Sequence, residues 1–248
     1  MARFHGLERA HGTYAVKAEA TGGKVKVKGR AKTLMEPVTE TLWRRHLAGE
    51  LGLGVVPIND DAAASFGAID VDVYDGLDLV ELGRVVARHA FPLTVCRTKS
   101  GGAHLYLFTS EPAPASLVRA KLMEWAVVLG HPSVEVFPKQ VKLASREDVG
   151  NWINVPYFGG DATDRYAVVE GRQLSVGEFL NHADRAAITP AQLEAIQVPE
   201  IALMEGAPPC LQHLARAGFP AGTRNNGLFC LGVFAKRAYG DEWERRLD

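Results

Sequence analysis

The sequence predicts an α+β fold: a β-α-β-β-α-β unit, preceded by a small α/β unit and followed by a helical segment. Between residues 66 and 137, strand-like apolar runs alternate with runs whose apolar residues recur at helical spacing. The expected elements are strand 66–74, helix 78–90, strand 93–96, strand 103–108, a helix opened by Pro112 and Pro114, and strand 134–137. This split-βαβ order gives an antiparallel sheet with two helices on one face. We expect the first and third strands at its centre, the second and fourth at its edges, and a site on the open face.

The N-terminal part predicts a hairpin, a helix and a short strand. Residues 13–34 predict the hairpin around Gly22-Gly23, residues 38–50 the helix and residues 55–58 the strand. The second arm of the hairpin carries a row of alternating cations, namely Lys24, Lys26, Lys28, Arg30 and Lys32. Lysines protect an exposed edge strand from unwanted pairing, and the same row suits a phosphate backbone. Both interpretations stay open at this point.

The C-terminal part predicts a strand and several helices. The strand covers residues 166–169, and capping boxes begin helices at Ser175 and Thr189. A proline-containing linker near residues 199–209 precedes expected helices at 210–217 and 225–239. We expect a catalytic domain over residues 1–195 and a helical segment over residues 196–248. Because residue 248 lies within a helical pattern, we expect this segment to continue in a longer protein.

The composition excludes several classes of protein. The 248-residue chain has a formal net charge of −1, so no global positive field draws it to nucleic acid and any such contact needs a local patch. No apolar stretch reaches the ~18 residues that cross a membrane. Cys96, Cys210 and Cys230 form no CxxC motif, so neither disulfides nor a zinc site are expected. A reducing, cytoplasmic compartment fits this cysteine usage.

The strand over residues 66–74 carries two carboxylates in an apolar setting. Side chains alternate along a strand, so Asp70 and Asp72 share one face, with their Cα atoms roughly 6–7 Å apart. Burial of two like charges is costly, and a divalent cation between them removes the cost. Oxygen ligands suit Mg²⁺ or Mn²⁺. Two solvated acids at a strand end would explain the pattern equally well.

Two further segments are expected near these carboxylates. Glycines in residues 97–104 leave the backbone without side chains, so that a ligand can approach it closely. The backbone N–H groups of this segment suit an anion nest, with Lys99 and His104 nearby. Such turns are often plain hairpins, and a lone strand histidine is more often structural. Glu135 lies on the last strand, which pairs with the first. Three carboxylates beside an anion nest suit two-metal nucleotidyl transfer, in which the metals lie ~3.5–4 Å apart.

These segments, in this order, resemble the three motifs of archaeo-eukaryotic primases, the primase-polymerase superfamily. The motifs are Asp70-x-Asp72, Ser100-Gly101-Gly102-Ala103-His104 and Glu135, and the flanking runs resemble the branch found in phages and mobile elements over roughly residues 5–170. The resemblance implies that Asp70, Asp72 and Glu135 are catalytic ligands of Mg²⁺ or Mn²⁺, with Glu135 at a position that is aspartate in many relatives. It implies that the nucleotide is bound by Lys99, Ser100, Gly101, Gly102 and His104, and less specifically by Lys139 and Asn154.

The function implied by the resemblance is a metal-dependent DNA primase-polymerase, a nucleotidyltransferase that acts in phage or mobile-element replication. Its partners would be a single-stranded DNA template with primer, dNTPs or NTPs, and a replicative helicase, and Lys24, Lys26, Lys28 and Arg30 would contact DNA. The zinc knuckle of many relatives is missing, which favours extension over autonomous priming.

Two other classes of function stay open from the sequence. One is a metal-dependent phosphohydrolase that uses the same acids, although the row of hairpin cations favours a template. The other is a non-catalytic RNA-recognition-type module, which has the same strand order and stacks bases on exposed sheet aromatics. The carboxylates on the expected open face weigh against this module, because without metal they repel a phosphate backbone.

Overall fold

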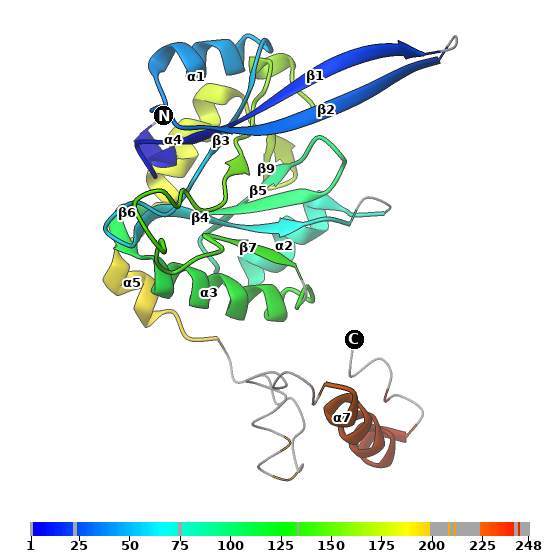
Figure 1. Cartoon of the computed structure of the whole chain (residues 1–248). Coiled ribbons are helices and arrows are strands. Elements are labelled where there is room, and N and C mark those ends of the chain that lie inside the picture. The colour runs from blue at the N-terminus through cyan, green and yellow to red at the C-terminus, as the bar shows by residue number, and fades with distance from the viewer. Residues whose placement is uncertain are drawn as a thin grey trace. The chain divides into compact units, whose positions relative to one another are not determined.

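The computed structural model of the chain describes residues 2–21, 24–73, 76–132, 134–198, 208, 211, 224–240 and 243, without the side chains of residues 2, 15–30, 224 and 239. The chain divides into two compact units, Met1–Gln197 and Val198–Asp248, which are described separately below. The first unit contains two antiparallel sheets with helices against them (Figure 1). The predicted α+β class is therefore confirmed.

A six-stranded sheet forms the centre of the first unit. Its order is β10 (Arg172–Gln173), β9 (Ala167–Val169), β5 (Leu93–Arg97), β6 (Ala103–Pro114), β4 (Ala63–Val71) and β7 (Glu135–Phe137). The predicted β-α-β-β-α-β unit is present, with β4 and β6 adjacent and β7 at an edge. The prediction that the second strand lies at an edge is wrong, because β9 pairs with β5 through Val95↔Val168 and Cys96↔Ala167.

Helices α2 (Leu79–Arg88) and α3 (Ala115–Val128) are the two helices of the β-α-β-β-α-β unit, and α3 packs beside β4. The Asp78 carboxylate caps α2 by accepting hydrogen bonds from the N–H groups of Val80 and Glu81. The prediction that Pro112 and Pro114 open α3 is wrong for Pro112, which lies in β6. Strand β6 continues past an irregularity in its pairing with β4 and so includes Pro112. A proline is tolerated at this exposed strand end because no backbone N–H is needed there for a hydrogen bond.

The other face of this sheet is covered, which corrects the prediction of an open face. A second sheet, with order β2 (Lys24–Leu34), β1 (His11–Thr21), β3 (Gly52–Val55) and β8 (Ile153–Asn154), contributes to this covering layer together with helix α1 (Glu40–Leu47). Phe4 of η1 (Ala2–Phe4) packs edge-on against Tyr106 and Phe108, with ring centroids 5.2 and 5.4 Å apart. Both β6 rings are fully buried, so they cannot stack bases as an RNA-recognition module would require.

The predicted hairpin forms, and β1 and β2 pair from His11↔Leu34 to Thr21↔Lys24. Only the first residues of β1, His11 to Tyr14, also pair with β3. Beyond Tyr14, the two strands continue as a long ribbon that leaves the body of this unit (Figure 1). Tyr14 therefore marks the root of the hairpin.

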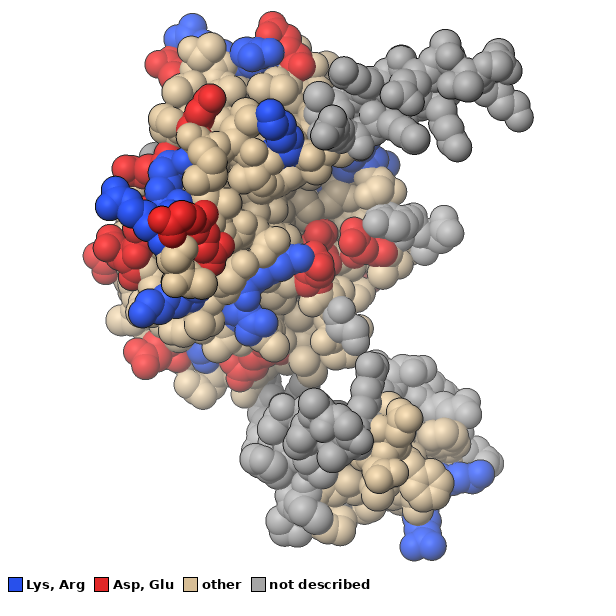
Figure 2. Space-filling view, viewed as in Figure 1, with Lys and Arg blue, Asp and Glu red and all other residues tan. Residues whose placement is uncertain are grey.

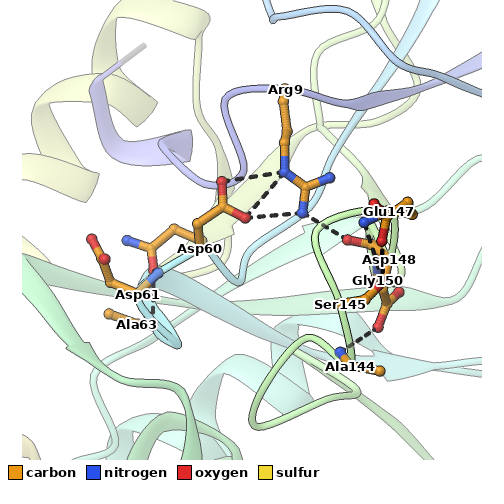
Figure 3. A network of polar contacts seen from close by, with 10 residues as sticks. Arg9, Asp60, Asp61, Ala63, Ala144, Ser145, Glu147, Asp148 and Gly150 are labelled. Carbon is orange, nitrogen blue, oxygen red and sulfur yellow. Dashed lines mark hydrogen bonds and ion pairs between the residues drawn. The ribbon is translucent and has the colours of Figure 1, made fainter.

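The segment between β7 and β8 is held by a polar network (Figure 3). Arg9 forms an ion pair with Asp60, with 2.9 Å between Nη2 and Oδ1, and donates to the Asp148 carbonyl at 2.7 Å. The Asp148 carboxylate accepts hydrogen bonds from the N–H groups of Ala144 and Gly150, each at 2.9 Å. These bonds lower the pKa of Asp148. The network fixes the chain immediately before β8, which reaches the candidate site.

The capping predictions for the end of the first unit are confirmed. Ser175 begins α4 (Val176–Ala186) and Thr189 begins α5 (Pro190–Ala195), each with a complete capping box. In the second unit, α7 (Arg224–Tyr239) confirms the helix predicted at 225–239, whereas the helix predicted at 210–217 lies almost wholly outside the described residues. Within the described part of the chain, no helix combines the length and apolar character needed to cross a membrane.

Candidate active site

The strand register gathers the predicted site residues around Asp70. On β4, Asp70 is paired with His104 of β6 on one side and with Glu135 of β7 on the other. Directly opposed residues of antiparallel strands share a face, so these three residues share one face of the sheet. The neighbouring Ile69 and Val71 are fully buried. The predicted alternation is therefore confirmed up to Val71, where β4 ends, and Asp72 lies beyond the strand.

Asp70 and His104 form a polar contact at the centre of the site. Asp70 Oδ1 lies 3.2 Å from His104 Nε2, and the side chains are only 17% and 13% exposed. This contact lacks hydrogen-bond geometry, so Oδ1 is buried without a hydrogen-bond partner. Buried carboxylate oxygens are almost always satisfied by a donor or a cation. An oxygen in this situation fits a ligand of a hard divalent cation.

Asp72 and Glu135 differ from Asp70 in their surroundings. Asp72 follows the end of β4, is exposed and lines the cavity described below. The Glu135 side chain is 57% exposed and turns toward Lys139, with 2.6 Å between Oε2 and Nζ. Across the described residues, no three His, Cys, Asp or Glu side chains form a group that could hold a metal ion. The strand register aligns Glu135 with Asp70, but metal binding would require its side chain to leave Lys139.

A cavity of about 430 Å³ lies beside Asp70, a volume that suits a small-molecule ligand. It is lined by Tyr14, Asp70, Asp72, Cys96, Arg97, Thr98, Lys99, Ser100, His104, Asn154, Val155, Pro156 and Arg165. Four of the residues predicted to bind a nucleotide are among them: Lys99, Ser100, His104 and Asn154. The other three, Gly101, Gly102 and Lys139, are not among the lining residues. Burial raises the pKa of Cys96, so its thiol stays neutral and unreactive.

The turn over residues 98–102 is held by its own backbone. Thr98 N–H donates to the Gly102 carbonyl at 2.9 Å, and Gly101 N–H donates to the Thr98 carbonyl at 3.2 Å. Gly101 has a φ of +95°, and a Cβ at Gly102 would clash with the carbonyl oxygen of Val71. The two glycines thus seat the turn against the end of β4. The N–H groups of Thr98 and Gly101 therefore donate inside the turn and are not free to bind an anion. The predicted anion nest is reduced to the other N–H groups of the turn.

Three cationic side chains line the cavity. Lys99 Nζ lies 4.7 Å from the centroid of the Tyr14 ring at the hairpin root. The Nη1 group of Arg97 donates a hydrogen bond to the backbone carbonyl of Asp164 at 2.9 Å. The Arg165 guanidinium lies 4.8 Å from the Phe158 centroid, and its Nε is buried without a hydrogen-bond partner. Burial lowers the pKa of Arg165, but a guanidinium stays charged in proteins.

Comparison with known families identifies the family of the chain. Residues 9–175 match the family described as "TOTE conflict system, Archaeo-Eukaryotic Primase domain". The chain belongs to the archaeo-eukaryotic primases. No curated protein matches the chain. The matched region of this primase domain runs from before β1 to the N-cap of α4 and contains Asp70, Asp72, His104 and Glu135. The predicted superfamily is confirmed.

Tyr14 and Arg165 are among the cavity-lining residues of this primase domain that the sequence did not predict as site residues. The sequence predicts Tyr14 only as part of a hairpin strand. Arg165 precedes a strand that was predicted without a partner, and its position depends on the pairing of β9 with β5. No local sequence signal marks this pairing, beside which Arg97 N–H donates to the Tyr166 carbonyl at 2.8 Å.

The residues predicted to contact DNA lie on β2 of the hairpin. The backbone register places Lys24, Lys26, Lys28 and Arg30 opposite Thr21, Glu19, Lys17 and Ala15, while the cationic side chains themselves lie outside the described part of the chain. On the body of the primase domain, acidic side chains gather where β4 ends and β7 begins, with basic side chains next to them (Figure 2). Opposite charges therefore lie close together around the site.

Proposed function

We propose that this primase domain is a metal-dependent primase-polymerase, which adds nucleotides from dNTPs or NTPs to a primer on a single-stranded DNA template. The observation that carries the proposal is the register of Asp70, which is flanked by His104 and Glu135 at a nucleotide-sized cavity. Membership of the archaeo-eukaryotic primases supports nucleotidyl transfer as the reaction class. We place its action in phage or mobile-element replication in the cytoplasm, with a replicative helicase as partner.

Asp70, Asp72 and Glu135 are the proposed ligands of two divalent ions, Mg²⁺ or Mn²⁺. The buried Asp70 Oδ1, which has no hydrogen-bond partner, and the exposed Asp72 carboxylate at the same cavity support this assignment. Bound divalent ions would neutralise the triphosphate and favour attack by the primer 3′-hydroxyl on the α-phosphate. No side chain of the protein need act as the nucleophile.

The protein's own contribution is to hold the triphosphate and the sugar. Lys99, His104 and Arg165 line the cavity that Asp70 and Asp72 also border. Positive groups placed in advance around a phosphate stabilise the charge that shifts during transfer. Arg165 is the cation that a phosphate would stabilise most. Its Nε is buried without a hydrogen-bond partner, which is costly for a charged group, and a bound phosphate would relieve that cost. Lys99 and Asn154 are the proposed contacts to triphosphate and sugar.

The template is proposed to lie along the hairpin. The alternating cations of β2 supply a local row of positive charge on a chain whose formal net charge is −1. The contact between Lys99 and Tyr14 joins the hairpin root to the nucleotide cavity. A template on the hairpin would therefore lead directly to the bound nucleotide.

Metal-dependent nucleotide binding tests this proposal before any turnover is measured. Titration of the full chain with a non-hydrolysable dNTP should give binding with Mn²⁺ that is lost in EDTA and in Asp70→Asn. Hydrolysis of dNTPs without template or primer, at a rate that template does not raise, would favour the phosphohydrolase instead. Equal binding with and without metal would contradict the assigned ligands.

A further inference from the structure

Tyr106 lies at the centre of a polar chain that leads from the site into the core. It is on β6, two residues beyond His104, and it is fully buried. Its hydroxyl donates a hydrogen bond to the Asn154 carbonyl at 2.6 Å and lies 3.0 Å from His104 Nδ1. His104 and Asn154 both line the cavity. One hydroxyl therefore contacts two residues of the proposed nucleotide site.

The single proton of this hydroxyl determines the direction of both hydrogen bonds. A carbonyl oxygen only accepts, so the Tyr106 proton is directed to Asn154. The tyrosine oxygen must then accept from His104, which requires a hydrogen on Nδ1. Burial raises the pKa of Tyr106, so its proton is retained. Nδ1 carries hydrogen in the neutral and in the charged ring, and Nε2 is the nitrogen that faces Asp70 Oδ1 at 3.2 Å.

We propose that Tyr106 is a positioning residue of the nucleotide site, which fixes the tautomer and orientation of the His104 ring and the position of Asn154. This inference rests on the proposed function for its effect on catalysis, but not for the proton arrangement. Because β6 and β8 belong to different sheets, the hydroxyl also ties the two sheets together at the cavity. Loss of the hydroxyl would release the His104 ring and the carbonyl of Asn154 at once.

Tyr157 provides a matched control within the same primase domain. It is almost fully buried, its hydroxyl donates to the Leu174 carbonyl at 3.0 Å, and it accepts from Ala167 N–H at 3.1 Å. Both partners are backbone groups, and none of these three residues lines the cavity. Tyr157→Phe should therefore cost stability as Tyr106→Phe does, without altering the nucleotide site.

The direct test is the state of the His104 ring in the full chain, read by ¹⁵N NMR of the imidazole nitrogens. In the wild type, Nδ1 should be protonated, and in the neutral ring Nε2 should be the unprotonated nitrogen. Tyr106→Phe should mix the two tautomers, and Tyr157→Phe should leave them unchanged. A wild-type ring with hydrogen on Nε2 alone would overturn the inference, whether or not the protein polymerises nucleotides.

A double-mutant cycle tests the effect on nucleotide addition. Tyr106→Phe should raise the KM for the nucleotide about five- to thirtyfold, the factor that corresponds to the loss of a buried hydrogen bond, and should change kcat less. In a His104→Ala background, most of this effect should disappear, because the tyrosine acts mainly through the histidine. Full additivity of the two substitutions, or an equal KM increase in Tyr157→Phe, would show that Tyr106 has only a structural role. If His104→Ala alone leaves nucleotide addition unchanged while the tautomers still respond, the proposed role of His104 fails and the proton arrangement stands.

Discussion

At the scale of single residues, His46 shows how burial gives a histidine a purely structural role. Its Nδ1 accepts from Leu53 N–H at 3.1 Å, so Nε2 must donate to the Pro156 carbonyl at 2.8 Å. The neutral ring satisfies both contacts, and burial lowers the pKa of His46. His46 lies in the helix predicted at residues 38–50 and is fully buried in α1.

The lowered pKa of His46 predicts a loss of stability in mild acid. The unfolded chain takes up this proton near pH 6.5, and the folded protein does so only at lower pH. Stability should be complete above that value and fall as the pH drops below it, by up to about 1.4 kcal/mol per pH unit for one group. Thermal melts from pH 7.5 to 5.5 measure the slope, which should be smaller in His46→Gln. Burial also lowers the pKa of His131 and His182, so some slope should remain; an unchanged slope would contradict the account.

At the scale of elements, Gly102 joins the 98–102 turn to the end of β4. Gly102→Ala should push the turn away from Val71, cost about 1–3 kcal/mol of unfolding free energy and raise the KM for the nucleotide. Gly83→Ala is the matched control, because Gly83 lies in α2 with nothing within 4 Å of an added Cβ. That substitution should add roughly 0.5–1 kcal/mol of stability and leave KM unchanged. Chemical denaturation and nucleotide titration of both variants would separate the two results, and equal behaviour would contradict a specific role for Gly102.

The hairpin should bind the template through its cations. Replacement of Lys24, Lys26, Lys28 and Arg30 by glutamine should weaken single-stranded DNA binding and reduce its salt slope by up to about 3, at roughly 0.7 per phosphate contact. Nucleotide affinity should not change, because the strand register places the four residues beyond Tyr14, the root of the hairpin. Fluorescence anisotropy at several salt concentrations gives the slope. An unaltered slope would support the edge-protection interpretation of the lysine row.

Elements were predictable where their signals are local. The Ser175 and Thr189 capping boxes, the glycine-centred hairpin and the helical spacing of α2 each lie within a few residues, and each prediction is confirmed. The pairing of β9 with β5 joins residues more than seventy positions apart, and nothing local marks it. Alternation along one strand is a local signal, so it predicted which face of the sheet carries Asp70. The layer that covers Tyr106 and the position of Arg165 depend on long-range strand pairing, so the sequence did not predict them.

At the scale of the whole molecule, the boundary of the catalytic unit can be tested by truncation. The family match ends at residue 175, but Phe179 and Ala183 of α4 are buried in the core beside Tyr157. A chain that ends at Gln197 should therefore fold and extend primers, as its compact first unit suggests. A chain that ends at Ser175 should unfold, because it exposes this part of the core. Circular dichroism and primer extension measure both, and insoluble or inactive 1–197 protein would show that the second unit is required.

The central claim is that Asp70 and Asp72 hold catalytic metal ions, and primer extension tests it most directly. A labelled primer on a single-stranded template should be extended by the full chain with Mg²⁺ or Mn²⁺, and not in EDTA. Asp70→Asn and Asp72→Asn should each lower the rate at least about a hundredfold, with melting temperatures close to the wild type. Asp61→Asn, an exposed residue before the opposite end of β4, should extend normally. Wild-type rates in either site variant, or extension that persists in EDTA, would contradict the account.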